Sequence, residues 1–471
     1  MISEGINPVE GKNKGFLGKT FLLMLFLPVF LLVVASYFND VISANEFSAN
    51  MSSFLIALLC WGVVGRELCA RVFGRRLFWV MTIAILFRIA ANFIHFYYIF
   101  APLAGIDSSA VLTSADYTGD LTVIFNSALL FNEAFDHGGL LYAIFGNYYR
   151  AMNNPGVAVI YGSLFRVFGA YGTIAISWTV VYSAFASLLI GLIGLVQRLP
   201  VRFCRTAALL VFFMPGFFVF PPLYRDNFII FLLVLSAYTA VLLTRKNIFL
   251  LSAAIFLESI LLLSLRSVYL IIPPAYCAIS ILNFKSRKKF IIYAVIFGFF
   301  TLVAIFLSWD FLNYYFVRFL ERLGGGFESE LSDFAIMTPF KAMGLLFFYP
   351  AAAVFSLLAP MPWWQSVSPT LLAYQIFFYP QTWYSLAMLV ALFRSYKLGL
   401  MTKETSLLVM FALFIFLLAL FGSLNFAAGY VQVALPFVIL AAIRYLSANW
   451  KKCFVYSAAL IIVVHIVLWI I

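Results

Sequence analysis

An arginine and an aspartate stand together where two long apolar runs meet, a place in which ionisable side chains are costly unless they have a function. The pair is Arg225-Asp226, which follows Tyr224 and lies between the apolar runs 209–220 and 228–243. Runs of this kind enter lipid, so the turn between them is expected at the membrane edge. A guanidinium group there suits bidentate contact with a phosphate. The alternative is an ion pair that only flanks a helical hairpin.

Two further arginines interrupt apolar stretches. Arg88 lies within the run 77–99, and Asn92 and His95 follow at helical spacing, so the three side chains share one face. An arginine in the middle of a bilayer costs about 2.5–3.5 kcal/mol on the insertion scale. Arg88 therefore either has a structural partner, a carboxylate or a buried carbonyl, or contacts a phosphate or another polar substrate group. Arg266 is a third arginine, at a turn between two apolar runs.

Carboxylates that could act as a base stand in one polar stretch. Asp116 and Asp120 precede the apolar-periodic segment 121–131. Asp120 is well placed to cap the helix predicted there, whereas Asp116 lies about one turn earlier and is harder to explain in this way. A carboxylate at a membrane surface can act as a general base on a sugar hydroxyl. Tyr117 and Tyr269 lie near the charged candidates and either stack on sugar rings or belong to an interfacial aromatic belt.

Composition shows which elements must position these residues. Of the 471 residues, 65% are hydrophobic and only 10% are charged, and the mean hydropathy is +1.05. A soluble domain is about 45–50% apolar and about 25% charged. Because the apolar runs are continuous and recur throughout, we predict an all-α fold, a polytopic transmembrane helical bundle forming a single integral membrane domain over residues 1–471.

The net charge of +12 does not indicate nucleic-acid binding. Most Lys and Arg residues fall in short clusters between apolar runs, which is the positive-inside pattern and makes the membrane lipid the expected surroundings. The five cysteines and three histidines show no metal-ligand spacing. Neither a metal site nor a cofactor is predicted.

Placing seven basic clusters in the cytoplasm predicts the topology. The N-terminus is then cytoplasmic, and about thirteen spans follow. Two large external loops are expected, 101–155 and 309–372. Partly inserted or juxtamembrane helices are expected at 156–169, directly after the first loop, and at 342–359, within the second. All the candidate charges except Arg88 emerge on the outer face. The predicted spans are 18–37, 53–65, 77–99, 170–197, 203–221, 226–243, 247–264, 267–283, 290–308, 373–393, 404–422, 426–446 and 454–470.

The order of these features resembles a known family. The acid-containing loop at Asp116-Tyr117 precedes Asn154-Pro155-Gly156 and the segment 161–169, and Pro215 and Arg225-Asp226 follow. Over roughly residues 85–440 this order is similar to the GT-C superfamily of polytopic glycosyltransferases, in particular to bacterial relatives of the aminoarabinose and protein mannosyl transferases. No acidic pair of the kind that holds a metal in some members is present.

The resemblance implies a polyprenyl-phosphate-linked sugar donor and a glycan or lipid-linked acceptor. Transfer would take place on the periplasmic face of the bacterial inner membrane, in surface-polysaccharide assembly such as that of O-antigen, capsule or lipopolysaccharide. Carried onto this chain, the base would be Asp116, with Asp120 second. Arg88, Arg225 and Arg266 would hold the donor phosphate, beside Asp226.

Two other functions fit parts of the same pattern. An O-antigen-type polymerase would transfer a glycan from undecaprenyl pyrophosphate and would depend on the arginines more than on a carboxylate. A flippase for lipid-linked oligosaccharides would need polar residues along a path through the membrane, for which Arg88, Arg166 and Glu258 are the candidates. Inverted repeats and a Walker A sequence are both missing from the chain, which disfavours a secondary transporter and an ATP-driven one.

Overall fold

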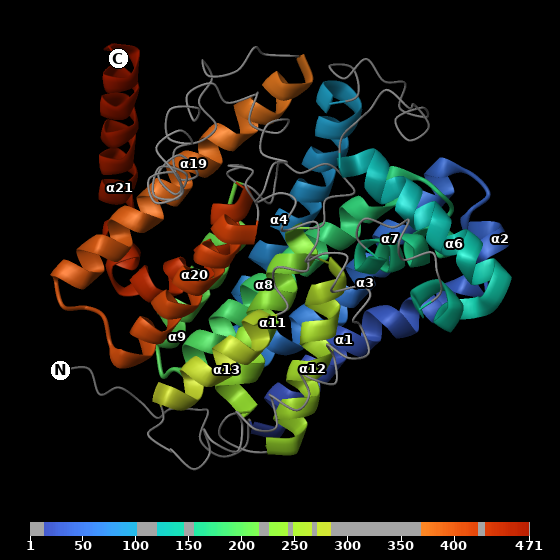
Figure 1. Cartoon of the computed structure of the whole chain (residues 1–471), viewed down its shortest axis with the longest axis horizontal. Coiled ribbons are helices and arrows are strands. Elements are labelled where there is room, and N and C mark those ends of the chain that lie inside the picture. The colour runs from blue at the N-terminus through green and yellow to red at the C-terminus, as the bar shows by residue number, and fades with distance from the viewer. Residues whose placement is uncertain are drawn as a thin grey trace.

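The regular elements are helices throughout the part of the chain that the structure describes. In this computed structural model the described residues are 14–100, 120–145, 155–215, 226–243, 248–265, 271–283, 369–422 and 429–470, and no strand occurs among them. The all-α prediction is confirmed for these residues. In chain order the helices are α1 (Lys14–Ser36), α2 (Asn39–Ile42), α3 (Glu46–Leu68), α4 (Arg75–Ile94), α6 (Asp120–Phe145), α7 (Pro155–Phe168), α8 (Ala175–Val196), α9 (Val201–Phe212), α11 (Asp226–Leu243), α12 (Ile248–Leu265), α13 (Ile272–Asn283), α19 (Pro369–Lys397), α20 (Lys403–Gly422) and α21 (Gly429–Ile470) (Figure 1).

Four helical segments are long and apolar enough to cross a membrane. Among the described residues they are Glu46–Phe73, Arg75–Tyr98, Ala175–Val196 and Gln432–Val463. This supports a membrane protein but not thirteen spans. One reason is that α9 ends at Phe212, although the apolar run continues to residue 220. Another is that the predicted spans 426–446 and 454–470 fall on α21, in which two helical parts meet at a kink at Asn449 and Gln432–Val463 forms one membrane-length segment.

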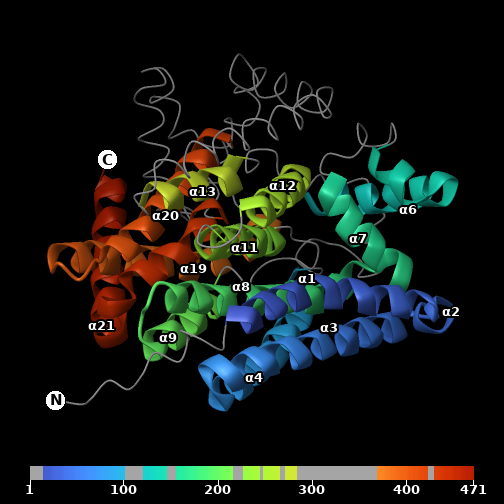
Figure 2. The same cartoon turned by 90° about the horizontal axis from the view of Figure 1, so that it is seen from below.

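Helix α8 forms the centre of the bundle. Nearly all of its side chains are buried, as expected for a helix that is apolar on every side. It packs against α3, α4, α9 and α11, and in both whole-chain views it lies between α6 and α7 at one end of the picture and α19 and α21 at the other (Figures 1 and 2).

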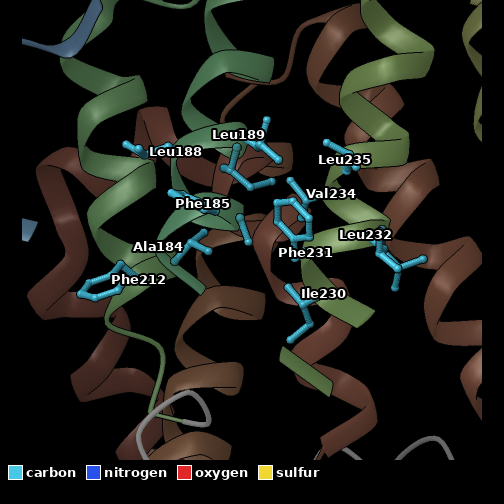
Figure 3. Close-up of a cluster of buried hydrophobic side chains, with 14 of the residues drawn as sticks. Ala184, Phe185, Leu188, Leu189, Phe212, Ile230, Phe231, Leu232, Val234 and Leu235 are labelled. Atoms are coloured by element: carbon cyan, nitrogen blue, oxygen red, sulfur yellow. The ribbon is translucent and has the colours of Figure 1, made fainter. Parts of the chain in front are cut away.

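Helices α8 and α11 run in the same direction and share an aromatic seam. The Tyr182 ring lies 4.9 Å from that of Phe228 and 5.0 Å from that of Phe231. One turn further along α8, the Phe185 ring lies 6.5 Å from that of Phe231. Figure 3 shows Phe185 of α8 and Phe231 of α11 among the buried apolar side chains of these helices. Pairs of this kind fix the register of α11, which begins at the candidate residue Asp226.

Two glycines on α8 let neighbouring elements approach closely. A Cβ atom on Gly191 would lie 2.7 Å from the Phe73 ring and 3.2 Å from the Cys204 carbonyl oxygen. A Cβ atom on Gly194 would lie 2.9 Å from Cys204 Sγ. Small residues at such positions are typical of tight helix contacts in membranes, where close packing drives association.

Helices α1, α3 and α4 also have an apolar face that is exposed and does not pack against the rest of the bundle. Large apolar side chains stand out from α1, α3 and α4, with exposed fractions between about a half and two thirds. Two of the membrane-length segments, Glu46–Phe73 and Arg75–Tyr98, belong to these helices, so this face is suited to contact with lipid chains. The side chains are Phe26, Val33, Leu55, Trp79, Ile83 and Phe87.

The two ends of the bundle differ in character. At one end the Arg205 side chain of α9 reaches Gly74, just before α4, since its guanidinium lies 3.1 Å from where a Cβ atom on Gly74 would be. At the other end the Tyr97 hydroxyl donates to Glu46 at 2.6 Å. Two basic segments of the chain, 66–76 and 198–205, therefore lie next to each other at this end of the bundle.

Candidate functional site

The predicted site residues divide into three groups. Arg88 is described in full, whereas Asp120 and Asp226 are described only as the first residues of α6 and α11. The remaining candidates lie outside the described residues; they are Asp116, Tyr117, Arg225, Arg266 and Tyr269. The site is therefore built around Arg88.

Arg88 is fully buried in the middle of α4 and contacts the end of α9. Its Nη1 donates to the Phe212 carbonyl oxygen at 3.1 Å, and its guanidinium carbon lies 4.5 Å from the centroid of the Phe212 ring. Among the residues that the structure describes, a buried carbonyl group is thus a partner of Arg88, one of the partners predicted for it. Asn92 and His95 are also buried, which confirms the predicted common face.

Helix α9 ends inside the bundle rather than crossing it. It has 12 residues, or about 18 Å at 1.5 Å per residue, against about 30 Å of hydrocarbon. Phe212 and Met214 are completely buried where the helix stops, and Pro215 follows, as is common just after a helix end. A helix that ends among buried side chains needs partners for its free backbone groups. We call residues 212–215 the helix break.

All four terminal carbonyl groups of α9, those of residues 209–212, accept a hydrogen bond. The first and third accept from the backbone N–H groups of Phe213 at 2.9 Å and Met214 at 3.2 Å. The second accepts from the Tyr384 hydroxyl at 2.7 Å, and the fourth accepts from Arg88. A cationic side chain also stabilises the negative end of the helix dipole. Two helices from distant parts of the chain, α4 and α19, thus complete this helix end.

Helix α19 brings more polar groups to the helix break. Gln381 lies one turn from Tyr384, is fully buried, and donates through Nε2 to Ser385 Oγ at 3.1 Å. The same helix contacts the π-helical turn His95–Phe100 that follows α4. Sequence spacing could not reveal this group, because Tyr384 and Leu210 are separated by 174 positions.

Two buried amides near these helix ends have acceptor atoms that no hydrogen bond satisfies within the described part of the chain. They belong to Asn92 on α4 and to Asn227, the second residue of α11. Their side chains are 7% and 3% exposed. Buried acceptors of this kind require an explanation, and a hydroxyl-bearing ligand would donate to them. The sequence analysis missed Asn227, although it directly follows the candidate pair Arg225-Asp226.

Arg166 and Glu258, the other residues expected at membrane depth, have different surroundings. Arg166 is partly exposed, with its Nη1 2.6 Å from Asp136 Oδ1, and it tethers α7 to α6. An exposed pair of this kind contributes about 0–1 kcal/mol to stability. Glu258 on α12 is buried, and its Oε1 accepts from the Thr239 hydroxyl of α11 at 2.6 Å.

We expect Tyr384→Phe to lower the free energy of unfolding by about 1–2 kcal/mol, because one terminal carbonyl of α9 would lose its partner in a buried place. Denaturant unfolding in detergent would measure the change. Tyr396→Phe is the matched control on the same helix; its ring is 72% exposed, so a change within about 0.5 kcal/mol is expected. Equal effects of the two substitutions would contradict the capping role.

Comparison with known proteins found no relative of this chain. No family model, no curated protein and no solved structure matches the chain.

Proposed function

We propose that the protein is a membrane glycosyltransferase that uses a polyprenyl-phosphate-linked sugar donor in the assembly of bacterial surface polysaccharide. One observation carries the proposal: a fully buried arginine, Arg88, donates a hydrogen bond to the last carbonyl group of α9 inside the bundle. Ionisable groups at membrane depth usually mark sites of function. Broken helices in membrane proteins often form the sites that hold polar substrates.

The chain order supports a phosphate site next to this helix end. From Pro215 only ten positions lead to Arg225, which directly precedes α11. Arg88 and Arg225 would contact the phosphate of the donor, with Arg266 as a third contact. A negative group also suits the first turn of α11, where backbone N–H groups are free to donate.

The proposed reaction is a displacement at the anomeric carbon of the donor sugar. Asp116 would take the proton from an acceptor hydroxyl, whose oxygen forms the new bond to that carbon. The bond between the carbon and the phosphate oxygen breaks, and polyprenyl phosphate leaves with the electron pair. The arginines would stabilise the charge that develops on the leaving phosphate. Asn92 and Asn227 would accept hydrogen bonds from sugar hydroxyl groups.

In this proposal the chain lies in the inner membrane with its N-terminus in the cytoplasm. The basic turns at one end of the bundle would face the cytoplasm by the positive-inside rule. The opposite end, where Glu46 meets Tyr97, would face the periplasm together with the start of α11.

The decisive experiment is a transfer assay with the purified chain and a lipid-linked sugar donor. In parallel, mass analysis would compare the lipid-linked glycans of cells with and without the gene. A missing sugar supports the transferase. Accumulated single repeat units would instead indicate the polymerase. A flippase would be indicated if no transfer occurred in detergent and lipid-linked glycan stayed on the cytoplasmic side of the membrane in cells. The buried Glu258 is the observation that favours this alternative.

We expect Asp116→Asn to reduce transfer at least about 100-fold, which is a typical contribution of a general base. Glu133→Gln is the matched control, since Glu133 is an exposed acid in the same predicted loop; its activity should stay within about twofold of the wild type. Initial rates at saturating donor would measure both. If Asp116→Asn keeps most of its activity, Asp116 is not the base and the polymerase becomes the better assignment.

A further inference from the structure

A second group of buried polar side chains lies away from the helix break, where α11, α12 and α13 pack against one another. Each helix contributes two such side chains, spaced three apart on α11 and α13 and adjacent on α12. All six are more than nine-tenths buried. They are Ser236, Thr239, Glu258, Ser259, Cys277 and Ser280.

Glu258 is the charged member of this three-helix cluster. Its Oε1 accepts from the Thr239 hydroxyl, while its Oε2 has no hydrogen-bond partner in the described structure. Ser236 lies within reach of the same carboxyl group, and Cys277 lies close enough to interact with it electrostatically. Glu258 forms no ion pair with any basic residue that the structure describes.

The six residues include a single carboxyl group, and three of their side-chain oxygen atoms have no hydrogen-bond partner in the described structure. Besides Glu258 Oε2, the hydroxyl oxygens of Ser259 and Ser280 have no partner among the described residues. An isolated buried carboxylate costs several kcal/mol, so it needs one positive charge beside it. Oxygen ligands suit hard cations, and one carboxylate balances one unit of charge. The described residues contain no group of three His, Cys, Asp or Glu side chains that could hold a metal ion of higher charge.

We propose that the α11–α12–α13 cluster binds one exchangeable monovalent cation, H⁺ or Na⁺, on the Glu258 carboxyl group. The site is independent of the proposed sugar transfer, since none of its residues belongs to that site. Through Thr239, occupancy of the site would act on α11, whose first residues are Asp226 and Asn227.

Few other ionisable groups lie on the helices that pack against α12. In the described part of the chain, α13 carries Tyr276 and Cys277, and α11 carries Tyr238 besides its first residue. Helix α7 carries Tyr161 and Arg166, and Arg166 is paired with Asp136. Glu258 is therefore the acidic group that the proposed cation would neutralise.

Infrared difference spectroscopy of the whole purified protein tests the proposal through the stretch of a protonated carboxyl. We expect a band in the wild type that is missing from Glu258→Gln and unchanged in Glu133→Gln. For H⁺, the band should fall as pH rises from about 5 to 9, because the neutral form loses its proton. For Na⁺, it should fall when sodium replaces choline at constant pH. A band that responds to neither would overturn the proposal, as would the absence of any band together with no effect of sodium.

A second measurement uses the wild-type protein alone, so it tests the proposal even when Glu258→Gln does not fold. Hydrophobic carbodiimides react with protonated carboxyl groups, and mass spectrometry can locate the adduct. We expect modification at Glu258 that slows about tenfold for each pH unit above its midpoint, or that sodium but not choline suppresses. Modification that neither pH nor sodium changes would show a permanently neutral structural acid and would contradict an exchangeable cation.

Discussion

Replacing Arg88 by methionine is expected to reduce sugar transfer roughly 100- to 1,000-fold. The substitution removes the proposed contact with the donor phosphate, and a hydrogen bond to a charged group contributes about 1.5–3 kcal/mol. It also leaves the Phe212 carbonyl group buried without this donor, so the end of α9 should shift. Together these losses correspond to about two to three powers of ten in rate. Initial rates with a lipid-linked donor would measure the effect.

Two variants separate binding from capping in this test. Arg88→Lys keeps the charge but not the planar guanidinium, so it should recover only part of the activity. Tyr384→Phe removes the neighbouring hydrogen bond to the same helix end and keeps Arg88; it should lose less than about tenfold. If Arg88→Met loses no more activity than Tyr384→Phe, Arg88 serves only to complete α9 and does not contact the donor.

Gly191→Leu is expected to have the largest effect on stability. A side chain there would meet the Phe73 ring and the backbone of α9, and backbone cannot move aside as a flexible side chain can. Overpacking of a tight core costs about 1–3 kcal/mol, and separation of α8 from α9 would add to this. Denaturant unfolding in detergent, with the yield of monodisperse protein, would measure the loss.

Gly62→Leu is the matched control for this substitution. Gly62 also lies in a membrane-length helical segment, but no atom stands within 4 Å of its missing Cβ. We expect its stability to stay within about 0.5 kcal/mol of the wild type. If both leucines destabilised the protein equally, the cause would be the residue type in a membrane helix and not the contact at Gly191.

The features that were predicted correctly from the sequence are those that depend on local sequence pattern. The spacing of Arg88, Asn92 and His95 was enough to place them on one face, because helical periodicity is a local property. The helix class and the membrane class followed from composition. Asp120 and Asp226 were singled out as charges at the edges of apolar runs, and both turn out to begin helices.

What depends on distant contacts could not be predicted in this way. The apolar run after α9 continues well past Phe212, so hydropathy alone extends the helix by nine residues too many. The hydrogen bond that Tyr384 donates to Leu210 at this helix end could not be predicted, because no local signal links the two residues. The sequence predicted separate spans at 426–446 and 454–470, and α21 is indeed interrupted between them, at Asn449, although no loop separates its two parts.

The way α9 is completed has a consequence for how the protein is made. Tyr384 leaves the ribosome 174 residues after the carbonyl group that it binds. At about 5–20 residues per second, that interval lasts roughly 9–35 s. Throughout it, the Leu210 carbonyl oxygen stays without its final donor, so the end of α9 is expected to reach its final structure only after α19 has been made. Chains released before that point are expected to be cleared by membrane proteases.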